Sequence, residues 1–316
     1  MARRMHAVYY TEFGGTEVLK TGELDMPAIG EGEVLVKIKA AAINPVDAAV
    51  RKGLLSSFIP CRFPVIPGWD VAGVVEERGF SARRFAAGDE VYAYARRPVV
   101  QWGTFAEYIV LPESYLALRP KNLSFEEVAG IPLVGLTAYQ SLFDAGNLQQ
   151  GQTVLMLGAS GGVGSLGIQL AKATGAQVIG VASEKNHAYM KKLGADATID
   201  YKGVNVGEAV KRIAQDGVDL IFDCAGGETL QQSLSALKPA GKVVSILNRG
   251  EGLDKNIQFQ YVFVEPNATE LAQLCQLAEV GKLQVPVSER YSLENAAQAF
   301  EQIETHHTTG KIVIVP

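Results

Sequence analysis

The stretch "ASGGVG" at residues 159–164 stands between an apolar run and a second run with helical spacing. Glycines allow the backbone to turn sharply and to come close to a ligand. A helix that starts here would offer unpaired N–H groups and the positive end of its dipole, which suit a pyrophosphate. Because an expected strand precedes the loop and an expected helix follows it, the stretch predicts a dinucleotide site.

The end of the next apolar run, "VIGVAS", indicates which dinucleotide would bind. In an NAD site, an Asp or Glu about 20 residues after the glycines accepts from the ribose 2′-hydroxyl. Here Ser183 and then Lys185 stand in that region, and they suit a 2′-phosphate that a carboxylate would repel. Tyr201, after the following expected strand, offers one more hydroxyl. We therefore expect NADPH rather than NADH, provided that the side chain of Glu184 points to solvent.

Metal-binding and disulfide patterns are not evident. The cysteines Cys61, Cys224 and Cys275 are far apart and form no CxxC pair, so neither a disulfide framework nor a thiolate zinc site is expected. His306 and His307 are adjacent, but the sequence suggests no third ligand near them.

Two kinds of secondary structure must position these residues. The first third contains short β-branched runs broken by Gly and Pro, which predict a β-rich, barrel-like domain. A helical segment begins near Leu123, with Ser124 as its N-cap and Glu127 three residues later. From Thr153, strands and helices alternate, which predicts a doubly wound parallel sheet with helices on both faces. The fold class is therefore α/β.

Length and charge limit the function. A chain of 316 residues is long enough for two domains. The formal net charge of -5 gives no general affinity for nucleic acid or anionic membranes. No apolar run is long enough to span a bilayer, and no apolar signal region follows Met1–Met5, so a cytoplasmic location is expected.

Several motifs together resemble one known family over nearly the whole chain. These are "AAINPVDAAVRKG", "FPVIPGWDVAGVV", "GDEVYA", "GTFAEY", "IPLVGLTAYQSL", "GASGGVG", "PAGKVVSI" and "TTGKIVIVP". The chain resembles the zinc-independent quinone oxidoreductase and enone reductase branch of the medium-chain dehydrogenase/reductase superfamily. The resemblance implies a GroES-like catalytic domain at 1–122 completed by 266–316, a Rossmann NADPH-binding domain at 123–265, an active cleft between them and usually a homodimer.

Zinc-containing members of the superfamily differ from this chain at their ligand positions. They carry Cys where Asn44 stands and a His-Glu pair where Trp69 and Asp70 stand, and they carry a four-cysteine lobe that this chain lacks. Asn and Trp are not credible ligands of a tetrahedral zinc ion. The resemblance therefore implies an enzyme that works without zinc.

The resemblance also assigns the site residue by residue. Asn44, the expected catalytic residue, and Thr137 lie near the nicotinamide. The pyrophosphate is bound by Ser160, Gly161, Gly162 and Val163, and the 2′-phosphate by Ser183, Lys185 and Tyr201. The nicotinamide is also bordered by Ile246, Leu247, Asn248, Phe263 and Val264, and Lys311 approaches the cofactor from the last strand. Relatives often carry Tyr or Lys two residues after Asp47, but Ala49 stands here, which predicts a wider and more apolar cleft.

A nicotinamide that works without a metal favours an acceptor already activated by conjugation, such as a quinone or an α,β-unsaturated ketone. The protein then needs only to align the acceptor and to donate a hydrogen bond to the developing negative charge. Asn44 or a backbone N–H could donate it, and the proton could come from water. Tyr92, Tyr94 and Tyr139 are candidate proton donors that we expect to serve in packing instead.

Three alternatives stay open from the sequence. They are a metal-free alcohol dehydrogenase, an enoyl-thioester reductase and a non-catalytic NADPH-binding protein.

Overall fold

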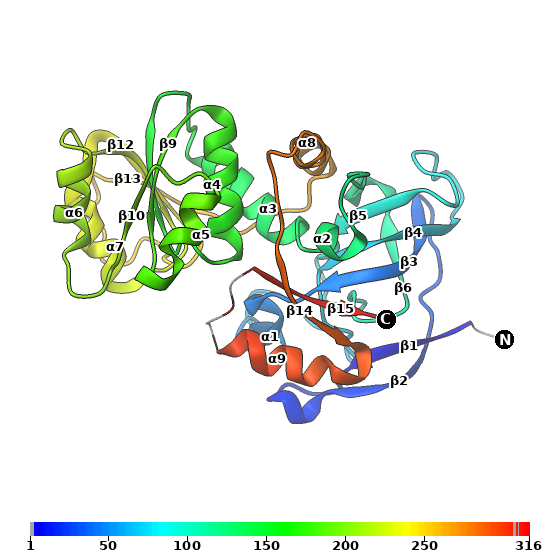
Figure 1. The fold of residues 1–316 in the computed structure, drawn as a ribbon. Helices are drawn as coiled ribbons and strands as arrows, with labels where there is room; N and C mark the ends of the chain where they lie inside the picture. The colour runs from blue at the N-terminus through cyan, green and yellow to red at the C-terminus, as the bar shows by residue number, and fades with distance from the viewer. Residues whose placement is uncertain (1–2, 306–307, 309) are drawn as a thin grey trace. The chain divides into compact units, whose positions relative to one another are not determined.

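The computed structural model describes residues 3–305, 308 and 310–316, and these divide into two compact units. Unit 1 comprises Met1–Leu133 and Glu265–Pro316, and unit 2 comprises Val134–Val264. The structure is mixed α/β, as the sequence predicts (Figure 1). Within the described residues, no helix is long and apolar enough to cross a membrane.

Unit 1 is built on a seven-stranded sheet. Six of its strands follow the order β14-β15-β3-β4-β5-β7, and the seventh, β6, pairs with β3. A separate antiparallel pair, β1 with β2, precedes it. The strands are β1 (Arg4–Tyr9), β2 (Lys20–Asp25), β3 (Glu33–Ala42), β4 (Asp70–Arg78), β5 (Glu90–Tyr94), β6 (Tyr108–Pro112), β7 (Leu116–Leu118), β14 (Val287–Ser292) and β15 (Lys311–Val315). Inward-facing Val, Ile and Ala side chains of β3, β4 and β5 form much of its core.

The helices of unit 1 are α1 (Pro45–Arg51), α2 (Phe125–Ala129), α8 (Ala268–Glu279) and α9 (Ala296–Glu304). The predicted N-cap of α2 is confirmed, since Ser124 Oγ accepts from the N–H of Glu127. The expected domain boundary at residue 123 would have placed α2 in the second domain. In the structure α2 packs against β3 and β4, and unit 1 therefore extends to Leu133.

The helical pattern expected after Leu123 is interrupted. Pro132 starts a new helix, α3 (Pro132–Tyr139), and a π-helical turn follows over Gln140–Ala145. Proline cannot donate a backbone hydrogen bond within a helix, so it separates α3 from α2.

Unit 2 is a six-stranded, entirely parallel sheet of order β10-β9-β8-β11-β12-β13. In chain order this is 3-2-1-4-5-6, the arrangement of dinucleotide-binding Rossmann domains. The strands are β8 (Thr153–Leu157), β9 (Gln177–Val181), β10 (Ala197–Ile199), β11 (Val218–Asp223), β12 (Leu237–Ser245) and β13 (Gln258–Tyr261). The doubly wound sheet expected from the alternating sequence is confirmed.

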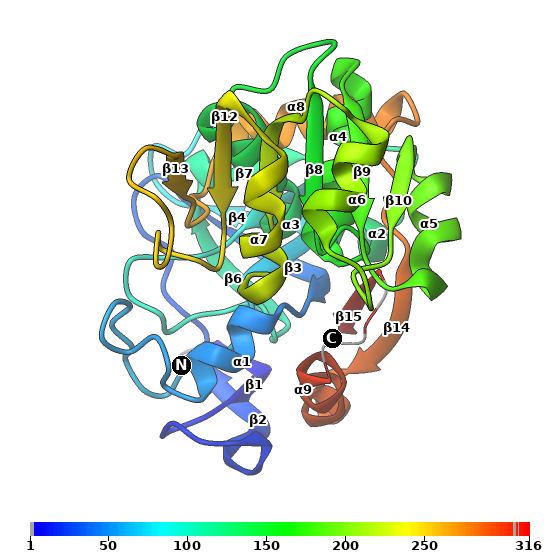
Figure 2. The same cartoon turned by 90° about the vertical axis from the view of Figure 1, so that its left-hand side faces the viewer.

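Helices cover both faces of this sheet, namely α4 (Gly162–Thr174), α5 (His187–Lys192), α6 (Val206–Ile213) and α7 (Gly227–Ser233). In Figure 1, α4 and α5 lie on one face and α6 and α7 on the other. Figure 2 looks onto the sheet from the side of α6 and α7. Both faces are apolar because both are buried, which explains the continuous hydrophobic runs of these strands.

Candidate functional site

The glycine-rich loop of unit 2 connects β8 to α4 at the centre of the sheet. Gly158 has a φ of +71°, which favours glycine. A Cβ atom on Gly164 would lie 2.5 Å from the carbonyl oxygen of Gly158 and 2.6 Å from Cα of Ala159. Only glycine at position 164 therefore lets α4 begin so close to the end of β8.

The N-terminus of α4 fits a pyrophosphate. Its N-cap is Gly161, and no side chain caps the first turn, so the N–H groups of Gly162 and Val163 remain for a ligand. The loop follows β8, between β9 and β11, where the strand order reverses. This switch point is where doubly wound sheets bind ligands. The structure therefore brings residues 160–163 together at a place suited to the predicted pyrophosphate.

The residues predicted to bind the 2′-phosphate gather at the next position along the same sheet edge. Val181 of β9 pairs with Ile199 of β10, so Ser183 and Tyr201 both lie two residues beyond paired positions. Lys185 and Glu184 are exposed in a short 3₁₀ turn. No carboxylate among the described residues pairs with the ammonium of Lys185, which leaves it available to an anion.

Asn186 is a residue of this region that the sequence analysis missed. Its Nδ2 donates to Ser160 Oγ over 3.0 Å and to Ser183 Oγ over 3.3 Å. It thereby links the glycine-rich loop to the turn after β9. No sequence signal distinguishes it, because an Asn in a helix-start turn is usually read as a cap.

Two further strand ends of unit 2 carry predicted nicotinamide neighbours. Ser245, the last residue of β12, pairs with Tyr261 of β13, so residues 246–248 and 263–264 leave adjacent strands. Ser245 Oγ accepts from the N–H groups of Leu247 (3.1 Å) and Asn248 (2.8 Å).

An unpredicted acid holds these strand ends. Ser245 Oγ donates to Asp223 Oδ2 over 2.6 Å, and Asp223 Oδ1 accepts from the N–H groups of Ala225 and Gly226. Asp223 is fully buried at the end of β11. The sequence did contain a signal for Asp223, because an acid ends the apolar run "DLIFD". A carboxylate at the end of a buried strand requires hydrogen-bond partners, which marks it as a structural residue.

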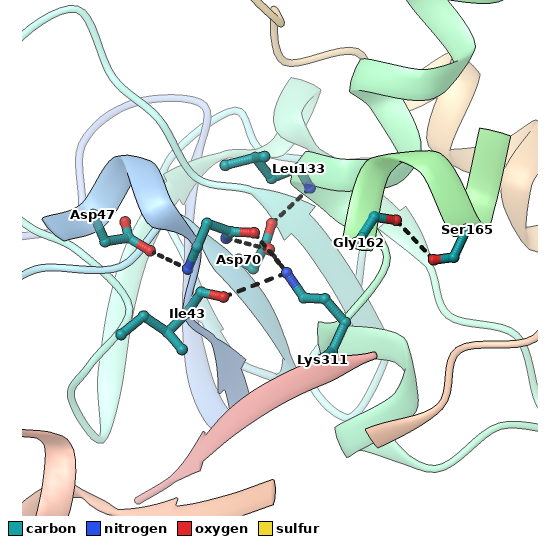
Figure 3. Close-up of polar contacts among 8 residues, drawn as sticks. Ile43, Asp47, Asp70, Leu133, Gly162, Ser165 and Lys311 are labelled. Carbon is teal, nitrogen blue, oxygen red and sulfur yellow. Dashed lines mark hydrogen bonds and ion pairs between the residues drawn. The ribbon is translucent and has the colours of Figure 1, made fainter. Parts of the chain in front are cut away.

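Unit 1 contains a separate, buried polar cluster that includes the expected catalytic residue. Asn44 is the N-cap of α1, directly after β3. Its Nδ2 donates to Asp70 Oδ2 over 2.8 Å, and its Oδ1 accepts from Lys311 Nζ over 2.5 Å. Figure 3 shows Asp47, Asp70 and Lys311 converging at the start of α1. The structure thus brings together Asn44 and Lys311, which are 267 positions apart in the sequence.

The sheet register explains this meeting. Ala42 at the end of β3 lies opposite Asp70 of β4 on one side and Val313 of β15 on the other. Asn44 therefore leaves the sheet between the first residues of β4 and β15. The other predicted nicotinamide neighbour, Thr137, is buried in α3, which belongs almost entirely to unit 2.

Backbone groups supply further partners to this cluster. The N–H of Leu133 donates to Asp70 Oδ1 over 2.7 Å, and the N–H of Asn44 donates to Asp47 Oδ2 over 2.8 Å (Figure 3). Lys311 Nζ lies 3.6 Å from Asp70 Oδ2 and 3.5 Å from the carbonyl oxygen of Ile43. Asn44, Asp47, Asp70 and Lys311 are all buried.

Burial shifts the titration of these groups. Desolvation raises the pKa of Asp47 to about 7, and the hydrogen bond from the Asn44 N–H opposes that shift only in part. Desolvation also raises the pKa of Asp70, although the charge of Lys311 and the hydrogen bonds from Asn44 and Leu133 act in the opposite direction. The pKa of Lys311 is lowered by the same loss of solvent.

These residues do not fit a zinc ion. The amide oxygen of Asn44 already accepts from the ammonium of Lys311. The ring of Trp69 packs edge-on against the ring of Tyr94, with centroids 6.1 Å apart. Within residues 3–305, 308 and 310–316, no group of three or more His, Cys, Asp or Glu side chains is placed to hold a metal. His306 and His307 lie outside the described residues. The zinc-free state remains a prediction that rests on this donor set.

The candidate tyrosine donors occupy packed positions. The Tyr92 hydroxyl donates to the carbonyl oxygen of Leu271 over 2.5 Å, and burial raises the pKa of both Tyr92 and Tyr94 well above its usual value. Tyr139 packs edge-on against Phe143, with ring centroids 4.8 Å apart. Tyr92 and Tyr94 are thus packed in the core of unit 1, while their part in proton transfer stays a prediction.

Comparison with known proteins gives the family. Residues 30–121 match the alcohol dehydrogenase GroES-like domain, and residues 193–314 match the zinc-binding dehydrogenase family. An NADPH-dependent alkenal/one oxidoreductase of Arabidopsis thaliana is 36% identical, covering 99% of this chain and 80% of the relative. A quinone oxidoreductase structure from Coxiella burnetii has a TM-score of 0.89 and 32% identity, covering 99% of this chain and 100% of that one. A structure described as an NAD-dependent alcohol dehydrogenase has a TM-score of 0.91 and 33% identity, with the same coverage.

These similarities extend over nearly the whole chain and both of its units. They agree with the GroES-like and Rossmann architectures and confirm the predicted fold class. The chain therefore belongs to the quinone oxidoreductase and alkenal/one oxidoreductase branch of the medium-chain dehydrogenase/reductase superfamily, a family of NAD(P)H-dependent oxidoreductases.

Proposed function

We propose that this protein uses NADPH to reduce a conjugated carbonyl compound, either an α,β-unsaturated ketone or a quinone, without zinc. The observation that carries this proposal is the hydrogen-bonded arrangement of Lys311, Asn44 and Asp70 in unit 1. It supplies an internal positive charge and an oriented amide where zinc-containing members of the superfamily hold a metal. Two of its relatives, an alkenal/one oxidoreductase and a quinone oxidoreductase, support the acceptor class.

Unit 2 would hold the cofactor. The uncapped first turn of α4 suits the pyrophosphate, while Ser183, Lys185 and Tyr201 suit the 2′-phosphate. When bound, NADPH supplies the reducing equivalent from C4 of its nicotinamide ring. The chain itself must bind the cofactor, orient the acceptor and stabilise the negative charge that develops on the acceptor oxygen.

Asn44 is suited to stabilising that charge. Lys311 donates to the amide oxygen, and Asp70 accepts one of the two amide hydrogens. One hydrogen of Nδ2 therefore remains to donate to an oxyanion. Hydrogen bonds in such a chain polarise one another, so the ammonium of Lys311 strengthens the donor on the opposite side of the amide. In this role Lys311 and Asp70 are positioning residues.

A metal-free alcohol dehydrogenase is the main competing function. It remains an alternative because one of the similar structures is described as an alcohol dehydrogenase. Oxidation of a saturated alcohol requires loss of its hydroxyl proton as hydride leaves the carbon, a step that a bound metal promotes, and the residues around Asn44 do not suit zinc. Consumption of NADPH and NADH should be measured against enones, quinones, enoyl thioesters and simple ketones, with NADP⁺-dependent alcohol oxidation in parallel. Rapid oxidation of secondary alcohols without enone or quinone reduction would replace the proposed function.

The same panel tests the other two alternatives. Activity restricted to enoyl thioesters would identify a thioester reductase. Cofactor binding without turnover of any acceptor would identify a non-catalytic NADPH-binding protein. The cytoplasmic location and the homodimer remain predictions; light scattering of the purified protein tests the second.

A further inference from the structure

The amide of Asn186 lies between two hydroxyl groups of unit 2. Its Nδ2 carries two hydrogens, and it donates to Ser160 Oγ over 3.0 Å and to Ser183 Oγ over 3.3 Å. Asn186 precedes α5 at the usual capping position, but its side chain caps no backbone N–H there. The amide is therefore committed to the two hydroxyl oxygens.

This arrangement determines which way the hydroxyl hydrogens can point. A serine hydroxyl has one hydrogen to donate and two lone pairs to accept. Each Oγ uses a lone pair toward Asn186, so each O–H must find its acceptor elsewhere. In the part of the chain that the structure describes, neither O–H has an acceptor, and Ser183 does not cap the turn that follows it.

Ser165, also near the glycine-rich loop, shows the opposite case. Its hydroxyl donates to the carbonyl oxygen of Gly162 over 3.0 Å and so has no hydrogen left for a ligand (Figure 3). Ser160 and Ser183 thus remain as donors, and the exposed Lys185 adds a positive charge two residues after Ser183.

We propose that Asn186 is a positioning residue that determines cofactor specificity, because it holds Ser160 and Ser183 as a pair of donors for the 2′-phosphate. The proposal reassigns the hydroxyl of Ser160 from the pyrophosphate, where the resemblance places it, to the 2′-phosphate, because that hydroxyl shares Asn186 with Ser183. The inference rests on the proposed use of NADPH and identifies a determinant that contacts no part of the cofactor itself. One phosphate group has three terminal oxygens and can accept from both hydroxyls and from Lys185. A ribose without the phosphate loses these hydrogen bonds, so Asn186 matters little for NADH.

The test measures binding of 2′,5′-ADP and of 5′-AMP to the full chain by calorimetry, because these probes differ only in the 2′-phosphate. Asn186→Ala should weaken 2′,5′-ADP about 3- to 10-fold, which is the worth of one or two neutral hydrogen bonds, and leave 5′-AMP within about twofold. Asn186→Asp should weaken 2′,5′-ADP further, because a carboxylate accepts from both serines and repels the phosphate. Asn205→Ala, which removes a helix cap elsewhere in unit 2, is the matched control and should leave the ratio unchanged.

The variants also distinguish this role from a structural one. If Asn186 acts through the serines, its replacement should have little further effect on 2′,5′-ADP in a Ser160→Ala/Ser183→Ala background. Equal weakening of both probes in Asn186→Ala, or no effect of either serine substitution on 2′,5′-ADP, would overturn the inference while NADPH preference stands. Equal affinity of the unmodified protein for the two probes would overturn the NADPH preference and this inference together. Loss of enone turnover is a separate measurement and leaves the binding result interpretable.

Discussion

The polar cluster of unit 1 and the cofactor loops of unit 2 use their polar groups in opposite ways. In unit 1, Asn44, Asp70 and Lys311 are buried and bonded to one another. In unit 2, the first turn of α4, the hydroxyls of Ser160 and Ser183 and the ammonium of Lys185 keep donors without protein acceptors among the described residues. The first arrangement satisfies nearly all of its polar groups without a ligand and leaves one hydrogen of Asn44 Nδ2 to donate, whereas the second leaves several donors for an anion.

This difference suits unit 1 to orienting the amide of Asn44 and unit 2 to recognising a phosphate. A buried network in which nearly every group has a partner holds one amide in one position, and breaking it leaves uncompensated charge. Donors at a sheet edge destabilise the unliganded protein little, because water can accept from them. When a phosphate binds, they form charge-assisted hydrogen bonds with it. We therefore expect substitutions in unit 1 to affect stability and turnover, and substitutions in unit 2 to affect cofactor affinity.

The largest expected effect is on the pH dependence of stability. Burial raises the pKa of Asp47 to about 7 in the folded protein from its ordinary value of 3.8, so between those values the folded state binds a proton that the unfolded state has released. The free energy of unfolding therefore decreases by about 1.4 kcal/mol per pH unit as pH rises through this window. The total is about 4 kcal/mol across the window.

Asp47→Asn should remove this contribution, because the amide does not titrate and its oxygen can still accept from the N–H of Asn44. Urea unfolding between pH 4.5 and 8 measures the slope for both proteins. The exposed Asp216→Asn serves as the control. An unchanged slope in Asp47→Asn would show that this carboxyl is ionised throughout the range.

The next largest effect is on turnover. Asn44→Ala should lower kcat about 10²- to 10³-fold, as expected for the loss of an oxyanion donor. NADPH affinity should change by less than about threefold, because the amide is proposed to act on developing charge. Stopped-flow turnover and fluorescence titration measure the two quantities. Asn122→Ala removes an amide that donates to the Ala278 carbonyl oxygen and is the matched control. Parallel losses of kcat and affinity would make Asn44 a cofactor-binding residue instead.

A smaller effect is expected from Lys185→Ala in unit 2. A hydrogen bond to a charged group is worth roughly 1.5–3 kcal/mol, so NADPH should bind about 10- to 150-fold more weakly. NADH binding should be nearly unchanged, because it lacks the 2′-phosphate. Calorimetric titration with both cofactors decides this, and equal losses would mean that Lys185 does not read the phosphate.

The smallest expected effect is that of a chelator, which should leave activity unchanged. The donor set around Asn44 and Trp69 does not suit zinc, so elemental analysis of protein purified without added metal should find far less than one equivalent per chain. Near-stoichiometric zinc, with activity lost on chelation, would contradict this prediction.

The sequence predicted the Rossmann unit well because its signals are local. The run before Gly158, the glycines and the alternation after Thr153 each specify an element within a few residues. The boundary near Leu133 depends on the packing of α2 against β3 and β4, which no local pattern encodes.

The candidate site was predictable only where a motif exists. Asn44 and Lys311 were each singled out by resemblance, but their hydrogen bond joins two ends of the chain. Asn186 and Asp223 act through partners contributed by other elements, so their roles depend on strand register rather than on sequence spacing.

The central claim is that the protein reduces a conjugated carbonyl directly with NADPH, and isotope transfer tests it. NADPH deuterated at both C4 positions should be oxidised in the presence of a simple enone, and the product should be analysed by NMR. One deuterium is expected at the β-carbon of the saturated ketone. A quinone is a poorer probe because its label exchanges. Deuterium at the carbinol carbon of an allylic alcohol, formed by delivery to the former carbonyl carbon, or an unlabelled product, would contradict the central claim.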